Sequence, residues 1–134
     1  MAWIAEKATD FPLKFSPSLG FNNLTTDVAT LAYIHKGTVV LCRLDGELTH
    51  TLRVEEGVRA FQVLLCSGED FDFLVVSLNT GVQVWSADGK RMIYFFAING
   101  STNSRAEDAQ YAQGIAMVPK GRIFVVGCSD GDVF

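Results

Sequence analysis

The sequence predicts an all-β fold in which short antiparallel strands recur in groups of four. One observation is local: runs rich in β-branched and aromatic residues alternate with turn signals such as Asp-Gly, which is typical of antiparallel hairpins. A second is an internal repeat, since similar runs recur with glycines at positions 37, 81 and 131. A third is the lack of helical patterns, because residues 104–111 offer at most about two helical turns, too few for a stable isolated helix.

The clearest group of strands lies between Phe73 and Ile98. Two turn signals, Asn79-Thr80-Gly81 and Asp88-Gly89, divide this segment into three strand-like runs. Glycine suits both turns because it adopts positive φ at little cost. We expect strands over residues 73–78, 82–86 and 91–98.

The rest of the chain repeats this pattern. Residues 73–81 align with residues 123–131, and residues 36–41 align with residues 80–85. The Asp45-Gly46 pair likewise corresponds to Asp88-Gly89. We expect the further strands at residues 28–35, 38–44, 47–54, 58–66, 113–118, 122–128 and 132–134.

Four strands in roughly 40 to 45 residues are typical of one blade of a β-propeller. The spacing therefore predicts a partial β-propeller of antiparallel blades, with about two complete blades and a truncated third. Residues 1–15 contain Pro12 and suit an edge or closing strand. Propellers close with about 4 to 8 blades, so we expect the chain to be part of a longer protein. The approximate blades are residues 16–56, 57–98 and 112–134.

Composition and charge predict a folded protein that does not bind nucleic acid directly. Hydrophobic residues make up 49% of the 134 residues and charged residues 19%, which is unlike a disordered chain. The net charge is −4 without a cluster of Lys and Arg, so the main attraction to phosphates is missing.

Apolar runs are too short to cross a bilayer, and Glu6 and Asp10 stand where a secretory signal would be apolar. We expect a cytoplasmic protein without membrane insertion.

The side chains that could carry chemistry favour structural roles. The three cysteines, at positions 42, 66 and 128, lie far apart within predicted strands and lack the close pairing of a zinc site, so we expect buried thiols. His35 ends a predicted strand and His50 lies in a polar run, outside any catalytic or metal-binding pattern. A nucleophilic Cys42 near His35 is the alternative, but its apolar neighbours favour a core thiol.

No enzyme or cofactor motif stands out in the sequence. The acidic residues at 55–56, at 69, 70 and 72, and at 107–108 lack the ligand spacing of an EF-hand loop. Nucleotide-binding and serine-hydrolase motifs are absent. We therefore expect no cofactor, no metal and no enzymatic activity. A quinoprotein-like propeller enzyme or sensor is the alternative, because residues 84–90 resemble the strand and turn before Gly-Lys in those blades.

Several short pieces resemble WD-repeat proteins. Residues 81–85 and 126–134 look like the second and third strands of WD-repeat blades. Ser86 stands where an Asp follows the Trp in regular repeats, and no Gly-His pair opens a blade. The resemblance implies WD-like blades in a non-enzymatic, cytoplasmic scaffold that binds other proteins. Its pieces, which together resemble the N-terminal propeller of a WD-repeat-containing protein, are residues 11–14, 22–24, 61–65, 81–83, 113–116 and 124–127.

The long polar connection at residues 99–112 is the candidate protein-binding surface. In a propeller, the connection between blades lies on the same face as the turn between the two middle strands, here at Gly37, Gly81 and Gly131. Its composition suits a polar, adaptable contact with one aromatic anchor; the alternative is a tolerated solvent-exposed insertion. The candidate residues are Asn99, Ser101, Thr102, Asn103, Ser104, Arg105, Glu107, Asp108 and Tyr111.

Open blades also predict self-association. In an incomplete propeller, blade faces and the strand at residues 132–134 lack neighbours. Exposed apolar surface and unpaired backbone favour contact with a second copy.

The cysteines give a first testable prediction. Because the three thiols fall on separate strands or in different blades, we expect all three to be reduced. Titration of freshly denatured protein should detect three free thiols per chain. Detection of fewer than three would contradict the predicted strand arrangement.

Overall fold

The computed structural model describes residues 23–45, 47–52, 55–67, 72–98, 112–118, 124–128 and 133. These residues form strands and turns without a helix, as the sequence predicts. Consequently the described part of the chain contains no helix that could cross a membrane.

The first sheet contains four antiparallel strands in chain order. A two-residue turn joins its two middle strands, and Lys36 and Gly37 in this turn have positive φ values of 50° and 77°, the geometry of a type I′ hairpin. The strand predicted from residue 28 begins at residue 30, because the Asp27 carboxylate accepts hydrogen bonds from the N–H groups of Ala29 and Thr30 in a tight turn, at 2.8 and 2.7 Å. The strands are β1 (Leu24–Thr26), β2 (Thr30–His35), β3 (Thr38–Arg43) and β4 (Leu48–Leu52).

The second sheet repeats this four-stranded order, and a third sheet contains two described strands. The second sheet is the meander expected between residues 73 and 98, preceded by one further strand. In the third sheet, Val133 adds an isolated bridge to Gly127. The strands are β5 (Ala60–Ser67), β6 (Asp72–Leu78), β7 (Gly81–Ser86) and β8 (Met92–Ala97) in the second sheet, and β9 (Ala112–Met117) and β10 (Phe124–Cys128) in the third.

The first two sheets also share local detail. In each, a β-bulge shifts the pairing between the third and fourth strands, at Leu41/Cys42 and at Val84/Trp85. In the turn after each bulge, an aspartate carboxylate accepts a hydrogen bond from the N–H two residues further on. These bonds join Asp45 to Glu47 and Asp88 to Lys90, each at 3.0 Å. The repeat seen in the sequence is therefore a repeat of structure.

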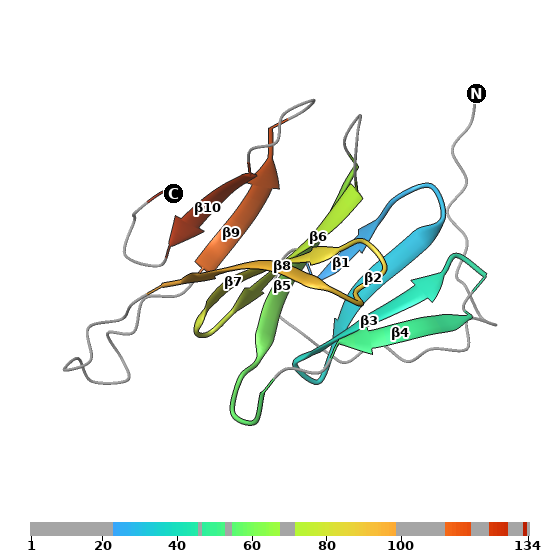
Figure 1. Ribbon diagram of the computed structural model, residues 1–134, viewed down its shortest axis with the longest axis horizontal. Coiled ribbons are helices and arrows are strands. Elements are labelled where there is room, and N and C mark those ends of the chain that lie inside the picture. Colours follow the sequence, from blue (N-terminus) through green and yellow to red (C-terminus); the bar gives the residue numbers. More distant parts are fainter. Residues whose placement is uncertain are drawn as a thin grey trace, which may run out of the picture.

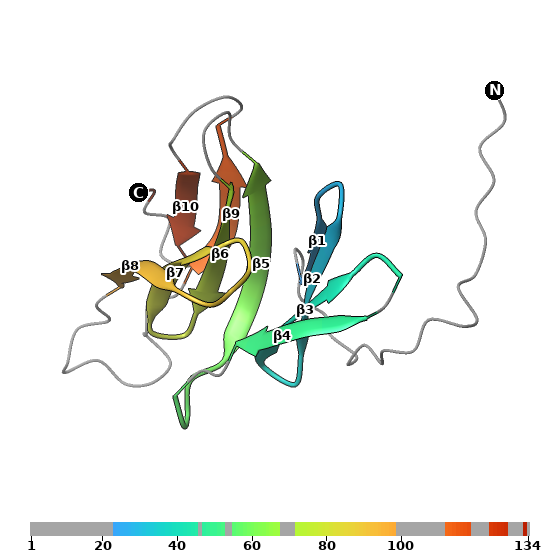
Figure 2. The ribbon, with the colours of Figure 1, turned by 45° about the vertical axis from the view of Figure 1, so that its right-hand side comes forward.

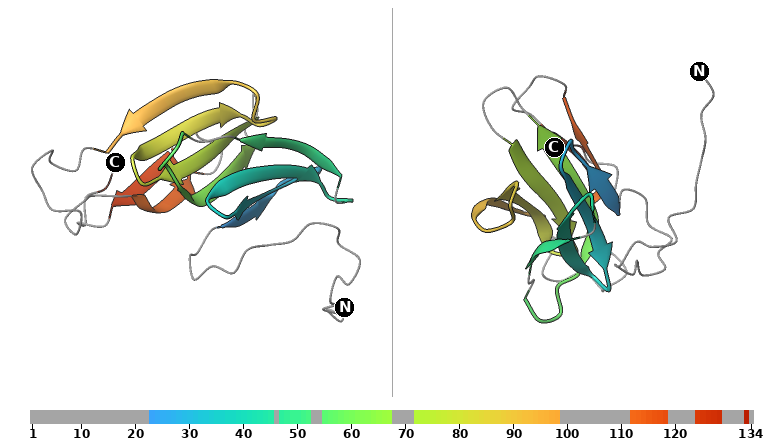
Figure 3. Two further views of the ribbon diagram at one scale, coloured as in Figure 1. Left: turned by 90° about the horizontal axis from the view of Figure 1, so that it is seen from below. Right: turned by 90° about the vertical axis from the view of Figure 1, so that its right-hand side faces the viewer.

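The second sheet lies between the other two (Figures 1 and 3). β5 packs against β1 and β2, whereas β9 packs against β5 and β6. The N–H of Leu65 in β5 also donates a hydrogen bond to Thr25 Oγ1 in β1, at 3.2 Å. The first strands of the three sheets are thus neighbours, as the inner strands of successive propeller blades are.

Two hydrophobic cores hold the sheets together, one on each face of the second sheet. Alternate side chains of a strand point to opposite faces, so β6 contributes Leu74, Val76 and Leu78 to one core, and Phe73 and Val75 to the other. The first core continues into the first sheet through Ala32, Ile34, Val39, Leu41 and Leu52. The second continues into the third sheet through Ala112, Ile115 and Val126.

These features identify the fold as all-β and as a partial β-propeller with four-stranded antiparallel blades, as the sequence predicts. The strands β1 to β4 fall within the predicted unit at residues 16–56, β5 to β8 within that at residues 57–98, and β9 and β10 within that at residues 112–134; the bounds of these units stay a prediction. The predicted closing strand at residues 1–15 lies outside the described residues.

Cys42 and Cys66 are buried free thiols, in β3 and β5, and Cys128 ends β10.

The central position of β6 gives the second prediction. Leu74 is 0% exposed and packs in the core shared by the first two sheets, so Leu74→Ala should lower the free energy of unfolding by about 2–5 kcal/mol. Urea denaturation followed by circular dichroism measures this loss. The control is Leu48→Ala on the exposed outer strand β4, which should change stability by about 0.5 kcal/mol or less. Equal effects of the two substitutions would contradict the arrangement.

Candidate protein-interaction surfaces

The binding residues predicted from sequence, Asn99 to Tyr111, lie outside the described residues. The structure does describe where this segment leaves the second sheet. Ile98 follows β8, and its N–H donates a hydrogen bond to the Thr80 carbonyl at 3.3 Å. Ile98, the last described residue before the candidate segment, therefore lies beside the turn between β6 and β7.

The equivalent connection between the first two sheets is described, at residues 55–59. The N–H of Ala60, directly after it, donates to the Gly37 carbonyl at 2.9 Å, in the β2–β3 turn. On its other side, Asn79 in the β6–β7 turn accepts a hydrogen bond at Oδ1 from the N–H of Arg59, at 3.0 Å, and donates from Nδ2 to the Gly57 carbonyl, at 3.3 Å. The connection is thus held between two hairpin turns.

We call this group the turn surface; it comprises Lys36, Gly37, residues 55–59, Asn79 and Thr80. Its exposed side chains are charged or polar, with both signs of charge present, at Lys36, Glu55, Glu56 and Arg59. Three segments far apart in sequence contribute to it. This arrangement confirms, for the first two blades, the rule that connections and middle turns share one face.

A second surface follows the outer edge of the second sheet, and sequence analysis missed it. β8 carries the run Met-Ile-Tyr-Phe-Phe-Ala, and among its large side chains Met92 is 48% exposed, Ile93 52%, Tyr94 59% and Phe95 41%. The run reads as a core strand, because hydrophobicity alone does not distinguish an edge strand from a central one. Exposed apolar patches of this kind mark interaction sites or aggregation-prone edges.

β8 approaches β7 closely because of Gly81. A Cβ at this position would clash with the carbonyl oxygen of Phe96 and would lie 3.0 Å from the Phe95 ring. Gly81 also has a φ of 155°, which side chains rarely adopt. Glycine therefore lets the Phe95 ring cover the backbone at the start of β7.

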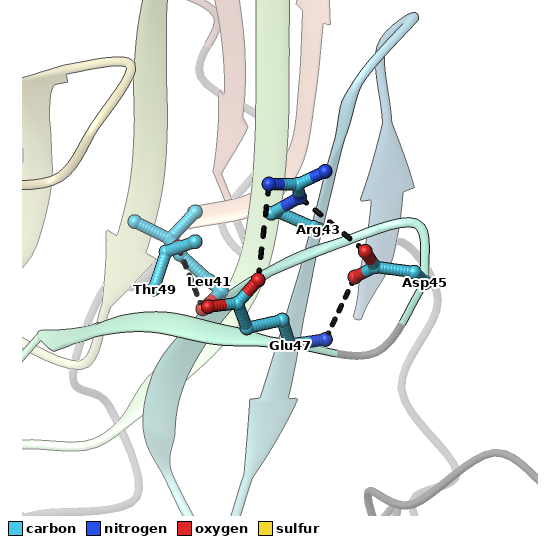
Figure 4. A network of polar contacts seen from close by, with 5 residues as sticks. All are labelled: Leu41, Arg43, Asp45, Glu47 and Thr49. Atoms are coloured by element: carbon cyan, nitrogen blue, oxygen red, sulfur yellow. Dashed lines mark hydrogen bonds and ion pairs between the residues drawn. The ribbon is translucent and has the colours of Figure 1, made fainter.

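The outer strand of the first sheet has a different chemistry, shown in Figure 4. Near β4, Arg43 forms exposed ion pairs with Asp45 at 3.5 Å and with Glu47 at 3.8 Å. Within β4, the Thr49 hydroxyl donates to the Leu41 carbonyl at 3.0 Å. Polar and charged groups thus lie around β4 beside its exposed Leu48, whereas β8 exposes a continuous apolar run.

His35 and Cys42 lie far apart in the structure. His35 lies opposite Thr38 and Cys42 lies opposite Leu31, at the two ends of the β2–β3 pair. Four residues along a strand separate them, which is about 13 Å. Burial, and to a smaller extent the Asp45 carboxylate, raises the pKa of the Cys42 thiol, so the thiol is protonated at neutral pH. The geometry therefore does not bring these two side chains together as a nucleophile and a base.

Cys66 is also a protonated thiol, since burial raises its pKa to about 11.

The segment that resembles quinoprotein blades comprises the end of β7 and the β7–β8 turn. There the Ser86 hydroxyl donates to the Asp88 carboxylate at 2.6 Å, and the N–H of Arg91 donates to Ser86 Oγ at 3.1 Å. The bond from Ser86 and that from the Lys90 N–H lower the pKa of Asp88. These polar groups stabilise the hairpin.

Asn79 provides the third prediction. Its side chain holds the connection at residues 55–59 through two hydrogen bonds, so Asn79→Ala should lower the free energy of unfolding by about 1–2 kcal/mol. Asn79→Asp keeps the acceptor for Arg59 but loses the donor to Gly57, and should cost less. The neighbouring Thr80→Ala, an exposed turn position, should cost about 0.5 kcal/mol or less. Urea denaturation compares the three variants, and equal stability of the Asn79→Ala and Thr80→Ala proteins would show that Asn79 does not hold the connection.

Comparison with protein-family models finds no match for the chain, and a search of curated proteins finds none either.

Proposed function

We propose that this chain is part of a non-enzymatic, cytoplasmic scaffold that binds other proteins through a WD-repeat-like β-propeller. We also propose that the chain forms the N-terminal part of a longer protein. The binding face would be the turn surface together with residues 99–111, which connect the second sheet to the third in the sequence, as residues 53–59 connect the first sheet to the second.

The connection at residues 55–59 is the observation that carries this proposal. Hydrogen bonds to Gly37 and Asn79 fix it between two turns, so exposed side chains from three segments are presented on a rigid frame. Rigid frames that carry polar loops are a common basis for protein recognition. Charges of both signs at Lys36, Glu55, Glu56 and Arg59 suit a partner surface with polar and charged groups rather than an apolar one.

The alternative of a quinoprotein-like enzyme gains no support from a described residue. The resemblance that suggested it lies in residues 84–90, and the polar groups of Ser86 and Asp88 in that segment bond to each other and to nearby backbone. Those contacts explain the segment as a turn.

The binding face gives the fourth prediction. Two variants of the intact protein would be compared with wild type: a short Gly-Ser connector in place of residues 99–111, and Glu55→Gln combined with Glu56→Gln. Ala112 stays in place because it is buried in the second core. Each variant should lose specific partners recovered from cells at an unchanged melting temperature, because it removes contact groups of the proposed face and keeps every described core residue.

A charge-matched control lies on the outer edge of the first sheet, away from the turn surface. Asp45→Gln combined with Glu47→Gln removes the same two charges near β4 and should retain all partners. If both binding-face variants retain the wild-type partners, the turn surface is not the binding face. Loss of the same partners in the control would also reject it.

A further inference from the structure

The outer strand β8 leaves a backbone edge open as well as apolar side chains. It is the last strand of the order β5-β6-β7-β8, so no described strand pairs with its outer side. Figure 2 shows β8 at the margin of the second sheet, on the far side from β5. Natural edge strands are usually protected by a charge, a proline or a covering segment. β8 contains neither a charged residue nor a proline.

The register between β7 and β8 indicates which backbone groups face outward. The Ile98 N–H bonds to Thr80, and pairs that exchange hydrogen bonds alternate along an antiparallel ladder. Phe96 and Tyr94, paired with Val82 and Val84, therefore bond to β7. Phe95 and Ala97 direct their N–H and C=O groups to the open edge.

We propose that two copies of this chain pair through antiparallel β8 strands, with the two-fold axis at Phe95. Phe95 of each copy then exchanges two backbone hydrogen bonds with Phe95 of the other, and the two second sheets join into one continuous sheet. This proposal is independent of the proposed binding face, because the turn surface takes no part in the pairing.

The side chains of β8 fit a second copy of the same strand. In this register Tyr94 lies opposite Phe96, giving two aromatic cross-strand pairs, and each Ile93 lies opposite the small Ala97. Because β8 carries apolar side chains on both faces, the strand that pairs with it should also be apolar on both faces. A second copy of β8 meets this requirement.

The charges beside β8 also favour the antiparallel arrangement. Lys90 and Arg91 precede the strand. Antiparallel pairing places the two basic pairs at opposite ends of the joined strands, whereas parallel pairing would bring four positive charges together. Like charges directly opposite one another destabilise a strand pair.

The buried area predicts a weak, reversible dimer. The large side chains of β8 are about half exposed, and side chains of this size present on the order of 150–200 Å² each. Pairing would then bury roughly 400 Å² on each copy, below the range of stable complexes and within that of transient ones. Interfaces of about twice this total area have dissociation constants that begin in the micromolar range, so we expect a weaker one here, on the order of tens of micromolar.

The fifth prediction tests this dimer by sedimentation equilibrium of the whole chain. Wild type should shift from monomer to dimer between about 1 and 200 µM, as expected for that dissociation constant. Phe95→Glu should weaken dimerisation at least about tenfold, because it places two carboxylates on the two-fold axis. Leu48→Glu, an exposed apolar position on the outer strand β4, is the matched control and should dimerise as wild type does.

Mixing two variants tests the register of the β8–β8 pair by a gain of dimerisation, not only by its loss. Phe95→Glu and Phe95→Lys should each be mainly monomeric, but an equimolar mixture should form a heterodimer, because opposite charges then face one another. Phe95→Cys should form an intermolecular disulfide under mild oxidation, since the two backbones would be close enough at the axis. Circular dichroism checks that each variant keeps the wild-type strand content.

Several results would overturn the proposal. These are a wild-type monomer at every concentration, a dimer insensitive to Phe95→Glu, a Leu48→Glu variant that loses dimerisation, or a charge-variant mixture that stays monomeric. Protection of β8 amides only after addition of an unrelated extended apolar peptide would also overturn it, by showing that a partner strand is the occupant.

Discussion

Burial of both faces of the second sheet is the constraint on which the rest of the structure depends. From Phe73 to Leu78 every residue of β6 is buried, because the first sheet covers one face and the third sheet covers the other (Figure 3). In the described part of the chain, the second sheet is the one that packs between two other sheets. A four-stranded sheet with one apolar face is stable only when that face is covered, so the second sheet supplies the common core for its neighbours.

The same constraint explains the polar surface at one end of the sheets. Packing three sheets face to face leaves their hairpin turns at the ends, where the backbone groups need other partners. Asn79 supplies two of these partners to the connection at residues 57–59, and the Gly37 carbonyl accepts a hydrogen bond from the N–H of Ala60, directly after it. The turns are therefore fixed relative to one another, which makes this end suitable for recognition, whereas the outer edge at β8 offers backbone and apolar groups.

Most of the fold could be predicted from the sequence, because β-branched runs between Asp-Gly and Asn-Thr-Gly turns define strands locally. The start of β2 could not, since the contacts of the Asp27 carboxylate with two backbone N–H groups depend on the folded turn. The separation of His35 from Cys42 followed only from the register. The exposure of Met92 to Phe95 could not be predicted either, because edge position is a property of the sheet order and not of the residues themselves. The candidate residues from Asn99 to Tyr111 lie outside the described residues and stay a prediction.

Native-state hydrogen exchange in increasing urea tests most directly whether the second sheet is the common core. The backbone amides of β6 should exchange only by global unfolding, and the amides of β2 and β3 should reach the same free energy of opening or a lower one. Their core residues Ile34, Val39 and Leu41 lose their cover when the second sheet opens. The contrary result would be protection of β2 and β3 at urea concentrations where β6 already exchanges, which would show that the first sheet is stable without the second.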